Sequence, residues 1–211
     1  MKPALATRTP RSTRRRAPEL TRRRASEVLD AAAKVFARRG YHGASTQDIA
    51  DVLGIRQACL YYYFDSKEAA LEAVCESGVE DYATRAQQVL KSDRSGAEKV
   101  ARLVFHHLAP MAERLDYTLV FLRERRFLPQ PARKRIRAIE VRYERIIQKI
   151  IEQAIASGEF RADLDERLAA LALLGLGNSA ALWLGREPGV TIERVTQNYV
   201  DLLVRAFRIR H

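Results

Sequence analysis

The sequence has only two cysteines and no long hydrophobic run. Cys59 and Cys75 form neither a C-x-x-C pair nor a disulfide framework, so a cysteine-rich scaffold is not expected. The most apolar stretch, residues 168–184, contains Asn178 and Ser179 and is shorter than the roughly 20 apolar residues that cross a bilayer. The N-terminus is basic but lacks the apolar run of a signal peptide, so we expect no membrane association and a cytoplasmic location.

The common signatures of enzymes are also missing. No P-loop, H-E-x-x-H or G-x-S-x-G pattern occurs in the 211 residues. His106 and His107 are adjacent, so a helix would point them about 100° apart, and neither has an acidic or cysteine residue three or four positions away. We therefore predict no enzyme, no cofactor and no metal site.

Acidic residues are few beside basic ones: 26 Asp and Glu face 37 Lys and Arg, which gives a formal net charge of +11. Much of this excess lies in the first 25 residues, where Glu19 is the single acid. A basic excess makes polyanions such as double-stranded DNA the leading class of partner. Residues 1–20 mix proline with Arg, Ser and Thr, and are expected to form a disordered basic arm that either contacts DNA or is a solvated tail.

Apolar residues recur at helical spacing through the rest of the chain, and no segment alternates with a period of two. This pattern predicts an all-α fold. A first helix is expected over residues 21–40, followed by short helices over 46–53 and 56–64 on either side of Gly54. A fourth helix should begin after Asp65 or Ser66. Later helices are expected over residues 98–128 with a break at Pro110, 132–157, 163–183 and 191–207.

The two short helices around Gly54 have the organisation of a helix-turn-helix, whose second helix enters the major groove of DNA. Leu60 and Phe64 are four positions apart and should pack inward, which directs other residues of the second helix away from the core. The residues expected to face outward are Gln57, Ala58, Tyr61 and Tyr62. Tyrosine hydroxyls donate to phosphate oxygens, and glutamine pairs with adenine edges. The exposed position of Cys59 fits either a small residue on this surface or a redox-sensitive thiol.

The strings "STQDIADVLGI" and "LYYYFDSKEAAL", after an amphipathic helix that ends in F-x-x-x-G, resemble the DNA-binding domain of the TetR family of transcriptional repressors. The matching positions are Thr46, Ile49, Ala50, Gly54, Ile55, Leu60, Tyr61, Tyr63, Phe64, Ser66, Lys67 and Leu71. The resemblance implies phosphate contacts from Thr46, Tyr61, Tyr63 and Lys67. It implies major-groove contacts from Gln47, Gln57, Ala58 and Tyr62.

The same resemblance implies a division of the chain. Residues 21–66 would form the three-helix DNA-binding domain, and residues 67–211 a larger helical domain for ligand sensing and dimerisation. The last two long helices would pack with their copies as a four-helix bundle. The protein would then be a homodimer that binds a palindromic operator. A non-specific architectural DNA-binding protein is the alternative, but it would not need so large a near-neutral domain.

The helix breaks at Pro110 and Pro129 leave room for an effector cavity. We expect its lining to include Phe105, Met111, Tyr117, Phe121 and Trp183. Arg123, Arg125 and Arg126 lie just beyond this apolar stretch, so one candidate effector is a thioester of coenzyme A whose phosphates are held by arginine forks. An unspecified small hydrophobic effector, or a solvated or dimer-rim role for these arginines, stays open. The expected function is a repressor released from its operator by such an effector.

Overall fold

The computed structural model describes residues 13–184 and 186–208, with side chains from residue 22 onward. In these residues the chain is helical throughout, with no strand, which confirms the all-α prediction. The elements are α1 (Thr13–Gly43), α2 (Thr46–Leu53), α3 (Gln57–Leu60), α4 (Lys67–Lys91), α5 (Gly96–Leu108), α6 (Met111–Glu124), the short 3₁₀-helix η1 (Arg125–Phe127), α7 (Gln130–Ala156), α8 (Glu166–Trp183) and α9 (Ile192–Phe207).

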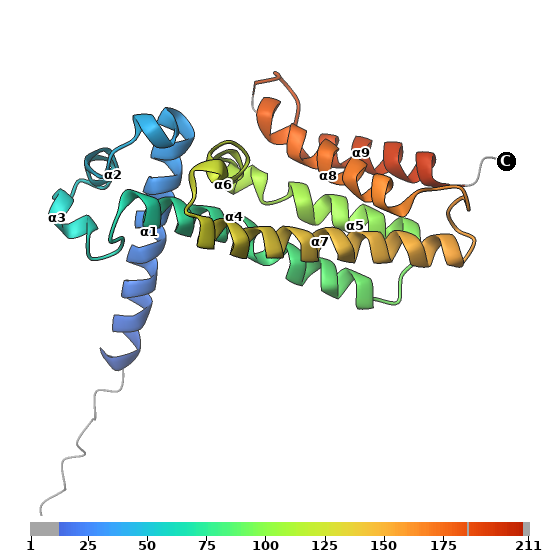
Figure 1. Ribbon diagram of the computed structural model, residues 1–211, viewed down its shortest axis with the longest axis horizontal. Coiled ribbons are helices and arrows are strands. Elements are labelled where there is room, and N and C mark those ends of the chain that lie inside the picture. Colours follow the sequence, from blue (N-terminus) through green and yellow to red (C-terminus); the bar gives the residue numbers. More distant parts are fainter. Residues whose placement is uncertain (1–12, 185, 209–211) are drawn as a thin grey trace, which may run out of the picture.

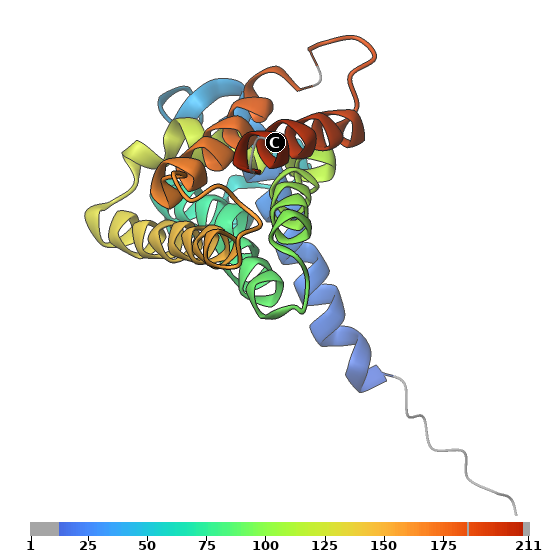
Figure 2. The ribbon, with the colours of Figure 1, turned by 90° about the vertical axis from the view of Figure 1, so that its right-hand side faces the viewer.

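The helices form an elongated molecule with α2 and α3 at one tip (Figure 1). Helix α4 packs against α7 along the body, while α8 packs against α7 and α9 against α5. The first turns of α1 project away from the body in both views (Figures 1 and 2). Helix α3 lies far from α8 and α9 (Figure 1). A contact made at the tip is therefore distant from any contact made by α8 or α9.

Two hydrophobic cores share α4. One core gathers residues of α1, α2 and α3, among them Phe36, Ile49 and Leu60, around the first half of α4. The other core is built by α5, α7, α8 and α9 around the second half of α4. The first core also takes up residues of α6 and the start of α7. A displacement of α4 or α6 would therefore alter the packing of both cores.

Side-chain caps fix most helix starts, as the sequence indicated. The Ser45 hydroxyl accepts from the Asp48 amide in a capping box at α2, and the Ser66 hydroxyl accepts from the Ala69 amide at α4. Asp165 caps α8 and Thr191 caps α9 in the same manner. The contact at α4 selects Ser66 over Asp65 as the residue after which the fourth helix begins.

Two boundaries in the N-terminal part differ from the prediction. Helix α1 begins at Thr13, so residues 13–20 are helical and not a disordered arm, while residues 1–12 lie outside the described residues. Arg, Ala, Glu and Leu have high helix propensity, and a helix already nucleated by packing extends readily through them. Helix α3 ends at Leu60 instead of residue 64. The amides of Tyr63 and Phe64 both donate to the Leu60 carbonyl, which turns the chain toward the cap of α4.

Candidate DNA-binding surface and effector cavity

Burial of a few apolar side chains sets the position of α2 and α3. Ile49 and Leu60 are 0% and 1% exposed, and they lie in one core with Phe36 of α1. Gly54 ends α2 in the left-handed conformation, with φ 65° and ψ 32°, which a glycine adopts without strain. The turn is closed by the Ile55 amide, which donates to the Ala50 carbonyl at 3.1 Å. This is the geometry of a helix-turn-helix.

The residues that follow the turn present aromatic rings to solvent. Tyr62 is 81% exposed and Tyr61 is 48% exposed, while Tyr63 and Gln57 are half-buried. Ala58 and Cys59 are also exposed. The prediction that the second helix directs these side chains away from the core is confirmed for Ala58, Tyr61 and Tyr62. Leu60 alone of this segment is fully buried, and it anchors α3.

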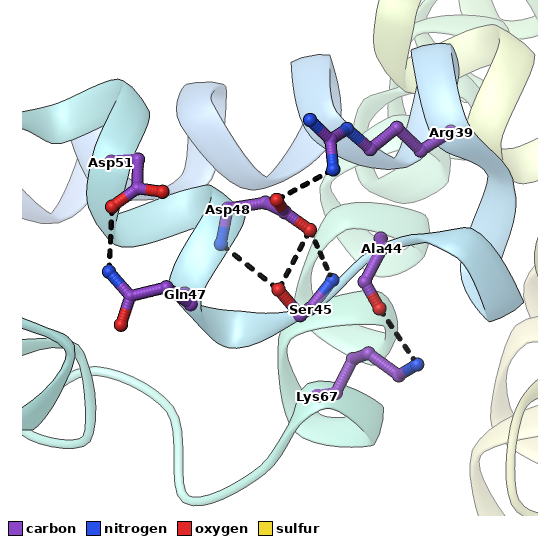
Figure 3. A network of polar contacts seen from close by, with 7 residues as sticks. All are labelled: Arg39, Ala44, Ser45, Gln47, Asp48, Asp51 and Lys67. Carbon is purple, nitrogen blue, oxygen red and sulfur yellow. Dashed lines mark hydrogen bonds and ion pairs between the residues drawn. The ribbon is translucent and has the colours of Figure 1, made fainter.

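Polar contacts fix several side chains around the start of α2 (Figure 3). The Asp48 carboxylate accepts from the Ser45 amide at 2.8 Å and from Arg39 Nη1 at 2.7 Å. The Ser45 contacts hold the pKa of Asp48 below its usual value. The capping box uses the amides of Ser45 and Asp48. The first-turn amides of Thr46 and Gln47 remain for an anion, since a helix leaves its first four amides without intrahelical partners.

Two of the predicted DNA-binding residues contact each other. Gln57 Nε2 donates to Thr46 Oγ1 at 2.7 Å, which joins the start of α3 to the start of α2. Gln47 Nε2 donates to Asp51 Oδ1 at 2.6 Å along the exposed side of α2 (Figure 3). Thr46 and Gln57 are thus joined by a hydrogen bond, and Asp51 orients the side chain of Gln47.

Lys67 has a structural role that the sequence did not reveal. Its ammonium donates to the carbonyls of Tyr41 at 3.0 Å and Ala44 at 2.9 Å, and it lies 4.4 Å from the centre of the Tyr41 ring. These contacts tie the end of α1 to the start of α4. An ammonium has three donors, so one remains for a phosphate.

Helix α6 is joined directly to α1 by hydrogen bonds. The Tyr117 hydroxyl donates to Asp30 Oδ1 at 2.6 Å, and the Tyr41 amide donates to Glu124 Oε2 at 2.9 Å. The Phe127 ring of η1 stacks on the Tyr41 ring with centroids 5.5 Å apart. The far half of the molecule is therefore attached to the helix that supports α2 and α3.

A cavity of about 340 Å³ lies among α4, α5, α6, α7 and α8. Its volume is at the lower end of the ~300–1,000 Å³ typical of ligand pockets. Its lining combines apolar side chains, buried polar groups and a charged rim. Among the lining residues are Val79, Tyr82, His107, Phe121, Arg125, Arg137, Glu140, Tyr143, Leu174 and Asn178.

Only some of the residues expected to line an effector cavity line a cavity of the structure. Phe121 lines this cavity, and Tyr117 lines a neighbouring one of about 300 Å³. Met111 is instead buried in the core, and Trp183 packs half-buried against that core without lining either cavity. Phe105 is 52% exposed, because it lies off the face of α5 that carries the buried residues Val100, Leu103, Val104 and His107. The prediction was therefore wrong for Met111, Trp183 and Phe105.

An open basic groove adjoins the cavity. The groove has a volume of about 770 Å³ and is lined by Arg125, Arg126, Leu128, Gln130, Arg133, Lys134, Ile136, Arg137 and Glu140. Arg125, Arg137 and Glu140 line both the groove and the cavity. Five cationic side chains face one carboxylate, so the groove attracts anions.

The predicted arginines are placed differently by the structure. Arg126 lines the groove, but Arg123 lines neither the groove nor the cavity. Residues four apart share a helix face, so Arg125 lies on the same side as Phe121 and lines the cavity with it. Arg123 lies on a different side. The Arg125 guanidinium lies 4.7 Å from the centre of the Phe121 ring. Arg125 was among the predicted arginines, whereas Arg137 is a cationic residue of the cavity that the sequence analysis did not select.

Comparison with known proteins decides the family. Residues 28–74 match the family described as "Bacterial regulatory proteins, tetR family", and residues 93–207 match the "Tetracyclin repressor-like, C-terminal domain". The chain belongs to the TetR family. Members of this family are DNA-binding transcription factors and not enzymes, so this chain is a helix-turn-helix transcriptional regulator.

TetR-family relatives with related sequences cover nearly the whole chain. The "Fatty acid metabolism regulator protein" of Bacillus subtilis (strain 168) is 26% identical over 179 residues, which are 84% of this chain and 92% of that protein. The "HTH-type transcriptional repressor KstR2" of Rhodococcus jostii (strain RHA1) is 24% identical over 186 residues, 88% of this chain and 91% of that protein.

Solved structures have the same fold. The TetR family regulator PfmR from Thermus thermophilus has a TM-score of 0.78 at 28% identity, covering 84% of this chain and 97% of that one. A structure of AibR in complex with isovaleryl coenzyme A and operator DNA has a TM-score of 0.76 at 23% identity, covering 86% of this chain and 98% of that one. The latter likeness concerns the fold alone.

Two further properties of this TetR-family chain follow from the described residues. None of its helices there has the length and apolar character that a membrane span requires. Groups of three or more His, Cys, Asp or Glu that could hold a metal ion are likewise absent from the described part of the chain. His107 lies among aromatic and amide side chains, with Tyr143 and Asn178 as its hydrogen-bonding neighbours.

Proposed function

We propose that this regulator is a cytoplasmic repressor that binds a palindromic operator as a homodimer and is released by a thioester of coenzyme A. In this proposal residues 21–66 bind DNA, and residues 67–211 sense the ligand and dimerise. The observation that carries the ligand assignment is the continuity of the basic groove with the apolar cavity through Arg125, Arg137 and Glu140.

The DNA-binding roles follow from exposure and donor chemistry. Tyr61, Tyr63, Thr46 and Lys67 would contact phosphates and position the protein on the duplex. The side chains that would contact base edges in the major groove lie on α2, on α3 and just after α3. They are Gln47, Gln57, Ala58 and Tyr62. The Gln57–Thr46 hydrogen bond supports this assignment, because it fixes Gln57 at the N-terminal end of α3, the part of a recognition helix that usually reaches bases.

The dimer assignment rests on an apolar stripe on α8. Leu168, Leu171 and Leu182 are 63%, 42% and 45% exposed, and their spacing places them on one side of the helix together with Gly175. Leu202 of α9 is 56% exposed. A contiguous exposed apolar surface of this kind is typical of a protein interface. A second copy of the chain would cover it and place two α3 helices for two half-sites.

The ligand assignment combines two surfaces of different chemistry. The cavity supplies Val79, Phe121 and Leu174 for an acyl group, and the groove supplies arginines that form bidentate contacts with phosphates. The Bacillus relative is a fatty acid metabolism regulator, and the AibR structure contains isovaleryl coenzyme A. Both names favour an acyl thioester over an unspecified apolar molecule.

Release of DNA would follow from the position of α6. This helix lines the cavity through Phe121 and is bonded to α1 through Tyr117 and Glu124. A ligand that prefers a different position of α6 would therefore favour a different placement of α2 and α3. The size of this effect is limited by the ligand's differential affinity for the two forms.

The proposal predicts that groove charges decide the response to coenzyme A esters. An Arg126→Ala, Arg133→Ala double variant should need at least about tenfold more acyl-coenzyme A to release DNA, because phosphate contacts of roughly 1.5–3 kcal/mol each are lost. Fluorescence anisotropy of a labelled operator, selected from random duplexes with the protein, measures the release.

A matched control removes equal charge from α7 outside the groove, in an Arg145→Ala, Lys149→Ala double variant. This control should respond as the unaltered protein does. The proposal would be rejected if free fatty acids release DNA as well as their coenzyme A esters do, or if the groove variant keeps the full response.

A further inference from the structure

The inner wall of the cavity carries a polar cluster, and Thr118 of α6 is a further buried polar residue of the lining. The polar cluster consists of Tyr82 of α4, His107 of α5, Tyr143 of α7 and Asn178 of α8, and all four residues line the cavity. His107 is 5% exposed and Tyr143 is 7% exposed, whereas the charged residues of the rim are half-buried or exposed. The polar cluster is therefore the deep part of the cavity.

Packing fixes the imidazole ring of His107. Its Nδ1 lies 3.3 Å from the Tyr143 hydroxyl oxygen, and its Nε2 lies 3.2 Å from Asn178 Oδ1. The His107 and Tyr143 rings are stacked with only 4° between their planes. Gly177 of α8 lies directly against the ring, since a Cβ there would come within 2.3 Å of a His107 ring carbon. The absence of a side chain at Gly177 is what lets α8 approach this closely.

The polar cluster has hydrogen-bonding groups left for a ligand. Burial lowers the pKa of His107 to about 4, so the ring is neutral near pH 7 and has one donor and one acceptor. If Nε2 donates to Asn178, Nδ1 accepts from Tyr143, and the Asn178 amide then keeps a free donor and Tyr143 a free acceptor.

The other tautomer of His107 also leaves hydrogen-bonding groups of Tyr143 and Asn178 free for a ligand. If Nδ1 donates to Tyr143, Nε2 must accept from the Asn178 amide in its flipped orientation. Tyr143 then keeps its hydroxyl donor, and the Asn178 carbonyl keeps an acceptor. In both cases Tyr143 and Asn178 keep at least one donor and one acceptor for a ligand at the cavity wall, and neither side chain carries charge. A carbonyl or hydroxyl oxygen satisfies such groups, whereas a hydrocarbon leaves them unpaired and a carboxylate meets no opposite charge.

We propose that the polar cluster binds an uncharged oxygen on the acyl group, so that the effector is a hydroxy- or oxo-acyl thioester and not a plain saturated one. This inference rests on the proposed function. Arg137 and Tyr143 are six positions apart on α7, which separates rim and polar cluster by roughly 9 Å along the helix. Phosphates at the rim and an acyl oxygen at the polar cluster are thus two distinct anchor points, with the apolar walls between them.

The test compares pairs of coenzyme A esters of equal chain length. Hexanoyl, octanoyl and decanoyl esters are titrated into the full-length protein by calorimetry, each beside its counterpart with a hydroxyl group on the last carbon. For at least one length the hydroxylated ester should bind about tenfold tighter or more. Tyr143→Phe, which removes only the hydroxyl, and Asn178→Leu should each reduce this preference to less than about threefold.

Tyr199→Phe is the matched control, because Tyr199 lies on α9 and lines no part of this cavity. It should keep the full preference, and thermal melting shows whether each variant is folded. Equal affinity of the two esters at every length, or a preference that survives both cluster variants, would overturn this inference alone. Failure of every ester to bind would overturn the proposed function and this inference with it.

Discussion

Replacing Leu168 and Leu182 with glutamate is expected to convert the dimer into a monomer and to lower operator affinity by about a thousandfold or more. Both side chains lie on the exposed apolar stripe of α8, so the substitution removes no core contact. Four carboxylates would face one another across the symmetric interface, and like charges at an interface cost several kcal/mol. A monomer contacts a single half-site and loses most of the specific binding energy.

Sedimentation at micromolar concentration and an operator titration measure the two effects on the same sample. Phe105→Glu is the control, because Phe105 is a comparably exposed apolar residue on α5, away from the stripe. That variant should remain dimeric and bind normally. A monomeric Leu168→Glu, Leu182→Glu protein that still binds the operator with full affinity would show that the stripe is not needed for recognition.

Gln57→Ala is expected to weaken binding by roughly 1–3 kcal/mol at particular base pairs, while Tyr61→Phe weakens binding to every duplex alike. Gln57 is fixed by Thr46 at the start of α3, where it can reach base edges. Tyr61 is 48% exposed and would lose only a phosphate donor. Titration against the operator and its single-base variants separates the two patterns.

The free energy of unfolding provides the control for these variants, and neither substitution should change it by more than about 0.5–1 kcal/mol. Lys67→Ala is not a comparable test, because Lys67 also joins Tyr41 and Ala44 and its loss would destabilise the DNA-binding end. An unchanged base preference in the Gln57→Ala protein would show that Gln57 does not contribute to sequence recognition.

The helix-turn-helix could be predicted because its determinants are local. Ser45 and Gly54 begin and end α2 through contacts within a few residues, and Leu60 is the buried residue that the spacing requires. The exposure of Tyr61 and Tyr62 follows from the same spacing. The length of α3 could not be predicted as well, since aromatic residues fit a turn and a helix end equally and the chain must also reach the cap at Ser66.

The effector site was less predictable because it depends on how distant helices meet. Phe105 and Met111 have the composition expected of a cavity lining, but the orientation of α5 and the packing of α6 place one outside and the other in the core. Arg125 and Arg137 reach the cavity from different elements and carry no shared local signal. The bonds from Glu124 and Tyr117 to α1 span more than 80 positions, which no local pattern indicates.

The central claim, that this chain is a sequence-specific dimeric regulator, is tested most directly by a competition titration at fixed physiological salt. A palindrome selected from random duplexes competes with a scrambled duplex of the same length and composition. A sequence-specific dimer should prefer the palindrome by about a thousandfold or more, with two protomers bound per duplex. Equal affinity for the two duplexes would contradict the central claim and would instead indicate a non-specific architectural DNA-binding protein.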